Sequence, residues 1–139
     1  MRLKKVVLDT NVWLSGLFWE GEASKIIELA EKGKIKVLIS EEIINEIVKV
    51  IQRESKFKKF IGELDEKIKD VIRTVLSISN LISIRNKINV VKEDPSDNTI
   101  LETALDGKAD YLITYDKHLL NIKEFGKIKI IQPNEFLNG

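Results

Sequence analysis

The sequence predicts a three-layer α/β/α fold, in which helices cover both faces of a central, mostly parallel sheet. Short apolar runs of strand length alternate along the chain with segments whose apolar residues recur at helical spacing. The runs show little alternation of apolar and polar residues, so both faces of each strand are expected to be buried, as in a parallel sheet. With 139 residues and no internal repeat, we expect one domain over residues 1–139.

The first half of the chain predicts a β-α-β unit followed by helices. Strands are expected at residues 6–8 and 35–39, with a helix at residues 23–31 between them. Ser40 is a favourable N-cap for a third segment, a helix that runs to about residue 52. The helical pattern then continues to residue 79 with a break near Gly62, which predicts a helical hairpin insertion around residues 55–79.

The second half predicts the remaining strands. Short stretches rich in β-forming residues stand at 81–84 and 88–91, and Asp94 with Pro95 opens another helix that is expected to end near Gly107. A strand at 111–114, a helical turn at 117–120 and a last strand at 128–131 complete the pattern.

Composition excludes several kinds of site. With no cysteine and one histidine, the chain cannot form zinc ribbons, thiol redox centres or iron–sulfur clusters, and we expect a cytoplasmic protein. The apolar run near the N-terminus is too short for a signal peptide or a membrane span, so no membrane partner is expected. The net charge of +1 gives no global argument for nucleic-acid binding, so such an argument must rest on local charge.

Acidic residues gather where ligands bind in such a sheet, outside the carboxyl ends of the strands. Asp9 and Asp116 each follow a predicted strand, so they are expected at the same edge. Asp97 falls within the apolar stripe of its predicted helix, and Glu46 borders the apolar stripe of the helix that Ser40 begins. The outer face of that same helix is expected to hold Glu42, Asn45 and Lys49.

Each acid also has a purely structural explanation. Asp97 with Asp94 resembles a capping box, Asp116 is a suitable N-cap, Asp9 fits a turn, and Glu46 suits an exposed helix position. These alternatives stay open for each residue taken alone.

Four acids at one edge nevertheless need a cation. Two carboxylates about 4 Å apart repel by roughly 4 kcal/mol at an effective dielectric constant near 20. Oxygen ligands without cysteine or a nearby histidine favour Mg²⁺ or Mn²⁺. Such ions polarise a phosphodiester and lower the pKa of a bound water, so the sequence predicts phosphodiester hydrolysis.

The chain resembles the PIN-domain family. The resemblance covers residues 5–136 and rests on four acidic motifs in the family's order, at residues 9–11, 42–47, 94–98 and 114–120. It is closest to the PIN-family toxins of toxin–antitoxin systems, which are similar to the VapC ribonucleases.

The resemblance implies a Mg²⁺- or Mn²⁺-dependent endoribonuclease. It assigns the catalytic and metal-binding quartet to Asp9, Glu46, Asp97 and Asp116. It also implies supporting roles for Asn11, Thr114, Asp94 and Asn98. An RNA substrate, a cognate antitoxin protein and a homodimer are the partners that it implies. A PIN-type nuclease that processes or degrades RNA without a toxin role is the alternative.

A basic and aromatic cluster is a candidate for contact with RNA. Lys56, Lys58 and Lys59 alternate with two phenylalanines, an arrangement that can hold phosphates and stack a base. The alternative is that the phenylalanines anchor the hairpin while the lysines are solvated. His118 is expected at the surface and is not required as a general acid.

Other metal-binding folds with an acid after the first strand fit less well. A phosphoaspartyl phosphatase should have a second Asp two residues after Asp9, where this chain has Asn11. A receiver domain should carry a phosphoacceptor Asp after its third strand, and residues 81–91 contain none. A binding module without activity would be expected to lose acids of the quartet, and all four are present.

Overall fold

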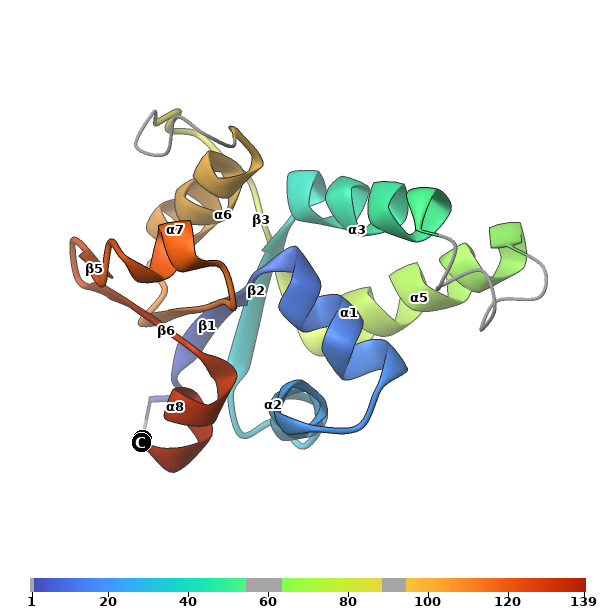
Figure 1. Cartoon of the computed structure of the whole chain (residues 1–139), viewed down its shortest axis with the longest axis horizontal. Helices are drawn as coiled ribbons and strands as arrows, with labels where there is room; N and C mark the ends of the chain where they lie inside the picture. Colours follow the sequence, from blue (N-terminus) through green and yellow to red (C-terminus); the bar gives the residue numbers. More distant parts are fainter. Residues whose placement is uncertain (1, 55–63, 89–94) are drawn as a thin grey trace.

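The computed structural model describes residues 2–54, 64–88 and 95–139, and it has the predicted α/β architecture (Figure 1). Within these residues, the central sheet has six strands in the order β3-β2-β1-β4-β6-β5. All neighbouring strands are parallel except β5 and β6. The strands are β1 (Lys5–Leu8), β2 (Lys36–Ser40), β3 (Ser79–Ile82), β4 (Tyr111–Ile113), β5 (Glu124–Phe125) and β6 (Ile128–Ile131).

Helices cover both faces of this sheet. They are α1 (Thr10–Phe18), α2 (Glu22–Glu31), α3 (Glu41–Arg53), α5 (Leu64–Ile78), α6 (Pro95–Asp106), α7 (Lys117–Leu120) and α8 (Pro133–Asn138). Figure 1 shows α1, α2, α3 and α5 on one side of the sheet and α6 and α7 on the other. The predicted three-layer arrangement is therefore confirmed.

The central strand β1 aligns the carboxyl ends of its neighbours. Leu8 pairs in register with Ile113 of β4, and the backbone N–H of Asp9 donates to the carbonyl of Ile113 at 3.0 Å. The residues that follow β1 and β4 therefore emerge side by side. This register brings position 9 next to position 114, although they are 105 positions apart in the sequence.

Helix α1 was not expected from the sequence. Its residues are apolar on nearly every side, and Val12, Trp13 and Leu14 are buried. A helix that is apolar all round shows no amphipathic period, so its helical spacing is hidden in the sequence. Asp9 caps its N-terminus, which makes the turn expected at residues 9–11 the start of a helix.

Two glycines allow close packing of elements behind the site. A Cβ on Gly16 of α1 would lie 2.9 Å from the carbonyl oxygen of Ala23 and would clash with the side chain of Ile27, so glycine permits α1 to pack closely against α2. Helix α6 ends at Asp106, next to Gly107 as predicted, but the residue with the left-handed conformation is Lys108, with φ of 56°. A Cβ on Gly107 would meet the side chain of Leu38 at 2.7 Å, so close packing explains this glycine.

Several element boundaries differ from the prediction. The strand expected at 81–84 begins at Ser79, and β5 and α8 were not predicted. The first part of the expected hairpin insertion, and residues 89–91 of the expected strand at 88–91, lie outside the described residues. No helix in the described part of the chain has the length and apolar character needed to cross a membrane.

Candidate active site

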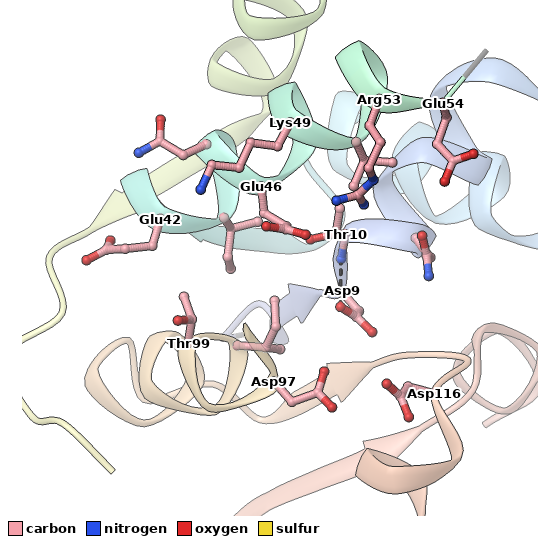
Figure 2. Close-up of a pocket in the computed structure, with 15 residues that line it drawn as sticks. Asp9, Thr10, Glu42, Glu46, Lys49, Arg53, Glu54, Asp97, Thr99 and Asp116 are labelled. Carbon is pink, nitrogen blue, oxygen red and sulfur yellow. Dashed lines mark hydrogen bonds between the residues drawn. The ribbon is translucent and has the colours of Figure 1, made fainter. Parts of the chain in front are cut away.

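Four acidic side chains from four separate segments line one cavity of about 500 Å³. Asp9 follows β1, Glu46 lies on α3, Asp97 lies in the first turn of α6, and Asp116 follows β4. Figure 2 shows the cavity between α3 and the first turn of α6, with the carboxylates of Asp97 and Asp116 pointing toward one another. The structure therefore brings together all four members of the predicted quartet.

Neutral hydrogen-bond donors hold the carboxylate of Asp9. Its Oδ1 accepts the backbone N–H of Thr10 at 2.8 Å, and its Oδ2 accepts the hydroxyl of Thr114 at 2.6 Å. Asp9 and Thr114 are both buried. These bonds orient the carboxylate and leave its negative charge in place, because neither donor carries a charge.

Thr114 links two of the acids. Its hydroxyl donates to Asp9 and accepts the backbone N–H of Asp116 at 2.9 Å. Asp116 in turn caps α7, since its Oδ1 accepts the N–H of His118 at 2.8 Å. Among the described residues, Asp116 Oδ2 has no hydrogen-bond partner. The N-cap function expected for Asp116 thus occupies one oxygen and leaves the other available to a ligand.

Asp97 and Glu46 approach from opposite walls. Asp97 is only 4% exposed although it is ionisable, as its place in the apolar stripe of α6 predicts. Glu46 is half-buried on α3. Asn98 is buried beside Asp97 and does not line the cavity, whereas Asn11 is exposed and does.

One face of α3 was assigned incorrectly from the sequence. The outer-face residues Glu42, Asn45 and Lys49 line the cavity together with Glu46 and Arg53. At 3.6 residues per turn, these five positions fall within a stripe about 100° wide. Extending the stripe from Glu46 along the helix would have found them, because Glu46 stands at its border with the buried face.

Three further cavity residues were also missed. Thr10, Glu54 and Thr99 line the site. Each lies within two residues of a predicted acid or at the end of the α3 stripe. Closeness in sequence to these residues is the one feature from which their place in the cavity could have been predicted.

Backbone dipoles favour negative charge at this edge. Helices α1, α3 and α6 all begin beside the cavity. The N-terminus of a helix carries partial positive charge, which stabilises nearby carboxylates. Tyr115, which precedes Asp116, is half exposed, and its pKa is raised because burial disfavours the phenolate and Glu22 adds negative charge.

The donor set fits a hard divalent cation. Carboxylate oxygens from four segments, with hydroxyl and amide oxygens nearby, are the ligand chemistry of Mg²⁺ and Mn²⁺. The cage is not closed, however: in the described part of the chain, no three Asp, Glu or His side chains are placed to hold one ion together. Binding would therefore require small rotations of these side chains.

Several residues named from the sequence are not among the described residues that line the cavity. Asp94 and the lysines at 56, 58 and 59 lie outside the described residues. His118 is exposed, as expected, and does not line the cavity. Glu102 is a further buried acid of α6, but its side chain accepts the backbone N–H of Ile88 at 2.8 Å and does not line the cavity.

Comparison with known proteins identifies similar chains. A family model described as PIN domain matches residues 5–118. A chain of VapBC2 from Rickettsia felis, bound to a DNA fragment from their promoter, is 15% identical with a TM-score of 0.61, covering 91% of this chain and 96% of that chain. The PIN domain of RRP44 from T. brucei is 11% identical with a TM-score of 0.51, covering 99% of this chain and 80% of that one. No curated protein sequence matches.

Proposed function

This chain belongs to the PIN-domain family, whose members are generally nucleases, and from that premise we propose that it is a Mg²⁺- or Mn²⁺-dependent endoribonuclease. We further propose that it is the toxin of a toxin–antitoxin pair. One observation carries the proposal: four carboxylates from segments far apart in the sequence line the same cavity.

In this proposal, the acidic residues of the cavity and Thr114 have different roles. Asp9, Asp97, Asp116 and Glu46 would supply oxygens to a divalent ion. When bound, such an ion polarises the phosphodiester and lowers the pKa of a nucleophilic water. Asp9 is held in one orientation because a backbone N–H and the Thr114 hydroxyl each donate to one of its oxygens. Asp116 keeps Oδ2 available to a ligand while Oδ1 caps α7.

The proposal is tested with single-stranded RNA and a matched pair of variants. Asp97→Asn removes one cavity carboxylate, whereas Asp106→Asn changes an acid of the same helix that lies outside the cavity. We expect cleavage by the wild type that stops with EDTA, a loss of about 100-fold or more in Asp97→Asn, and nearly full activity in Asp106→Asn.

Metal binding gives a second readout that does not depend on choosing the right RNA. Titration with Mn²⁺, followed by calorimetry, should show weaker binding to Asp97→Asn than to the wild type or Asp106→Asn. Cleavage that resists EDTA, or equal activity in all three proteins, would contradict the proposal. Failure of the wild type to bind Mn²⁺ at all would do the same.

The toxin role and the oligomer need separate measurements. The likeness to a chain of VapBC2 supports a paired antitoxin, and we propose a homodimer as well. A small gene beside this one, whose product binds the chain and silences cleavage, would support the toxin role. An active nuclease with no such inhibitor would instead be an RNA-processing or RNA-decay enzyme. Light scattering on the purified chain measures the oligomeric state.

A further inference from the structure

The acidic cavity has a basic side. Lys49 and Arg53 both line it, and both are exposed on α3. They are four positions apart in the sequence, so they lie on the same side of the helix about 6 Å apart along its axis. Figure 2 shows the Arg53 guanidinium extending from α3 toward Thr10. We name Lys49 and Arg53 the cationic rim.

Among the described residues, the cationic rim has no protein counter-ion. Ion pairs within the described ranges are confined to α5 and to the contact between Arg2 and Asp110, and neither Lys49 nor Arg53 takes part in one. Glu46 lies three residues before Lys49, yet the two do not pair. Both cations therefore stand beside the cavity with their charges available to a ligand.

Charge is sorted along α3. Within the helix, Glu42 and Glu46 occupy the part of the cavity stripe nearer its start, and Lys49 and Arg53 occupy the part nearer its end; the C-cap Glu54 follows Arg53 and also lines the cavity. A matching substrate would have its reacting group, which needs a cation, at the acidic part of the stripe. Its further negative charges would lie on one side of that group, along the basic part. A nucleic-acid strand is such a substrate, because each nucleotide adds one phosphate.

We propose that the cationic rim binds successive phosphates of the RNA strand on one side of the scissile bond, an inference that rests on the proposed nuclease function. A stacked strand advances about 3.4 Å per nucleotide, so the 6 Å between the two backbone positions corresponds to one to two nucleotides, and the two long side chains can reach neighbouring phosphates. Lys49, nearer Glu46, contacts the phosphate closer to the reacting group, and Arg53 contacts the next with its planar guanidinium. The strand leaves the cavity along the second half of α3.

RNA binding in EDTA tests this inference without cleavage. A short fluorescent single-stranded RNA is titrated with the wild type, Lys49→Gln, Arg53→Gln and the double variant at several salt concentrations. Lys25→Gln is the control, because Lys25 is exposed on α2 and does not line the cavity. Each single rim variant should weaken binding about fivefold at 0.1 M salt and reduce the salt slope by about 0.7, the value for one phosphate contact to a single strand.

Further readouts separate this inference from the nuclease proposal. Single-stranded DNA of the same sequence should show the same losses, because phosphates and not 2′-hydroxyls make the contact. Mn²⁺ affinity should be unchanged in the rim variants. If the double variant binds RNA with the affinity and the salt slope of the wild type, the proposal that the cationic rim binds phosphates is overturned. Rim-dependent binding by a wild type that neither cleaves RNA nor binds Mn²⁺ would instead overturn the nuclease and leave a strand-binding surface.

Discussion

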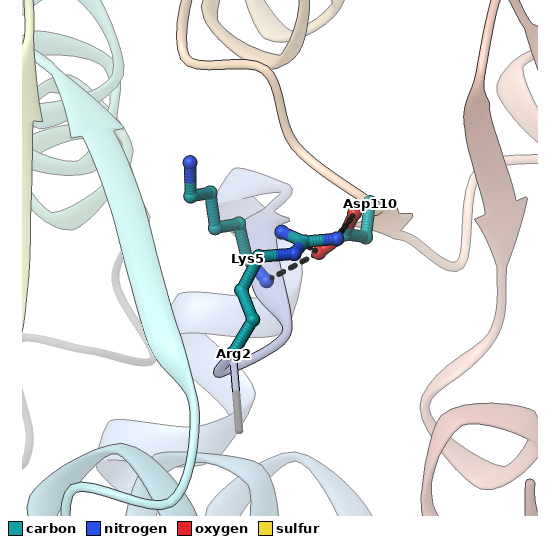
Figure 3. Close-up of polar contacts among 3 residues, drawn as sticks. All are labelled: Arg2, Lys5 and Asp110. Atoms are coloured by element: carbon teal, nitrogen blue, oxygen red, sulfur yellow. Dashed lines mark hydrogen bonds and ion pairs between the residues drawn. The ribbon is translucent and has the colours of Figure 1, made fainter.

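The two ends of strand β4 carry carboxylates in opposite electrostatic settings. Asp110 precedes the strand, and its oxygens accept two hydrogen bonds from the Arg2 guanidinium, at 2.8 and 3.1 Å, and one from the N–H of Lys5 at 2.8 Å (Figure 3). The Arg2 hydrogen bond is the main reason that the pKa of Asp110 is lowered. Asp116, beyond the other end, is bonded to a neutral peptide N–H and has no ion pair among the described residues.

This contrast separates structural acids from acids held ready for a ligand. At the amino edge, a cation of the protein neutralises the carboxylate, and the pair ties the N-terminal segment to β4. At the carboxyl edge, Asp9 and Asp116 are oriented by a hydroxyl and by backbone N–H groups, and none of these donors carries a charge. A cation from solution can bind the acids at the carboxyl edge, whereas Asp110 at the amino edge already has the Arg2 guanidinium as its partner.

Asp9→Asn should give the largest effect and the sharpest test of the contrast. We expect cleavage to fall by about 100-fold or more, because one ligand charge is lost. The free energy of unfolding without metal should change by only about 1 kcal/mol, because the lost hydrogen bond and the relieved repulsion oppose each other. Urea denaturation and RNA cleavage measure the two quantities. A large loss of stability with a proportionate loss of activity would make Asp9 a structural acid like Asp110.

Thr114→Val should have an intermediate effect. It removes the hydroxyl that joins Asp9 to the N–H of Asp116 while nearly preserving side-chain volume. We expect a loss of about 2 kcal/mol of stability, as for a buried hydrogen bond to a charged group, and a loss of about tenfold in Mn²⁺ affinity. Thr114→Ser should restore both. If the serine variant loses as much stability and Mn²⁺ affinity as the valine variant, the packing of Thr114, and not its hydroxyl, is responsible for both losses.

Asp110→Asn should have the smallest effect, confined to stability and to neutral pH. Because the folded-state pKa of Asp110 is lowered, its contribution is fully present above the unfolded pKa of about 3.9 and is lost as pH falls through the folded value. The variant should unfold at slightly lower urea concentration than the wild type at pH 7, and the difference should vanish in strong acid. RNA cleavage should be unaffected, and a loss as large as that of Asp9→Asn would show that the two edges are not functionally separate.

The layered fold and the convergence of the four acids could be predicted from the sequence. Local residue patterns indicate both the alternation of strands and helices along the chain and the residues at which strands end. Ser40 was correctly identified as the cap of α3, and its Oγ accepts the N–H of Ile43. Helix α1 escaped prediction because it is apolar on nearly every side. Lys49 was assigned to the wrong face, since a helix wheel distinguishes buried from exposed positions but not one exposed side from another. Which exposed side borders a cavity depends on α6, more than forty residues away.

The bond between Thr114 and Asp9 has a consequence for protein synthesis. β1 lies between β2 and β4, so one of its edges is paired early in the chain while the other waits for residues 111–113. N-terminal segments emerge first from the ribosome. Until β4 arrives, Asp9 lacks its hydroxyl donor and the cavity lacks Asp116. The centre can therefore form only after most of the chain has been synthesised, and a nascent or truncated chain that ends before residue 111 carries an incomplete set of acids.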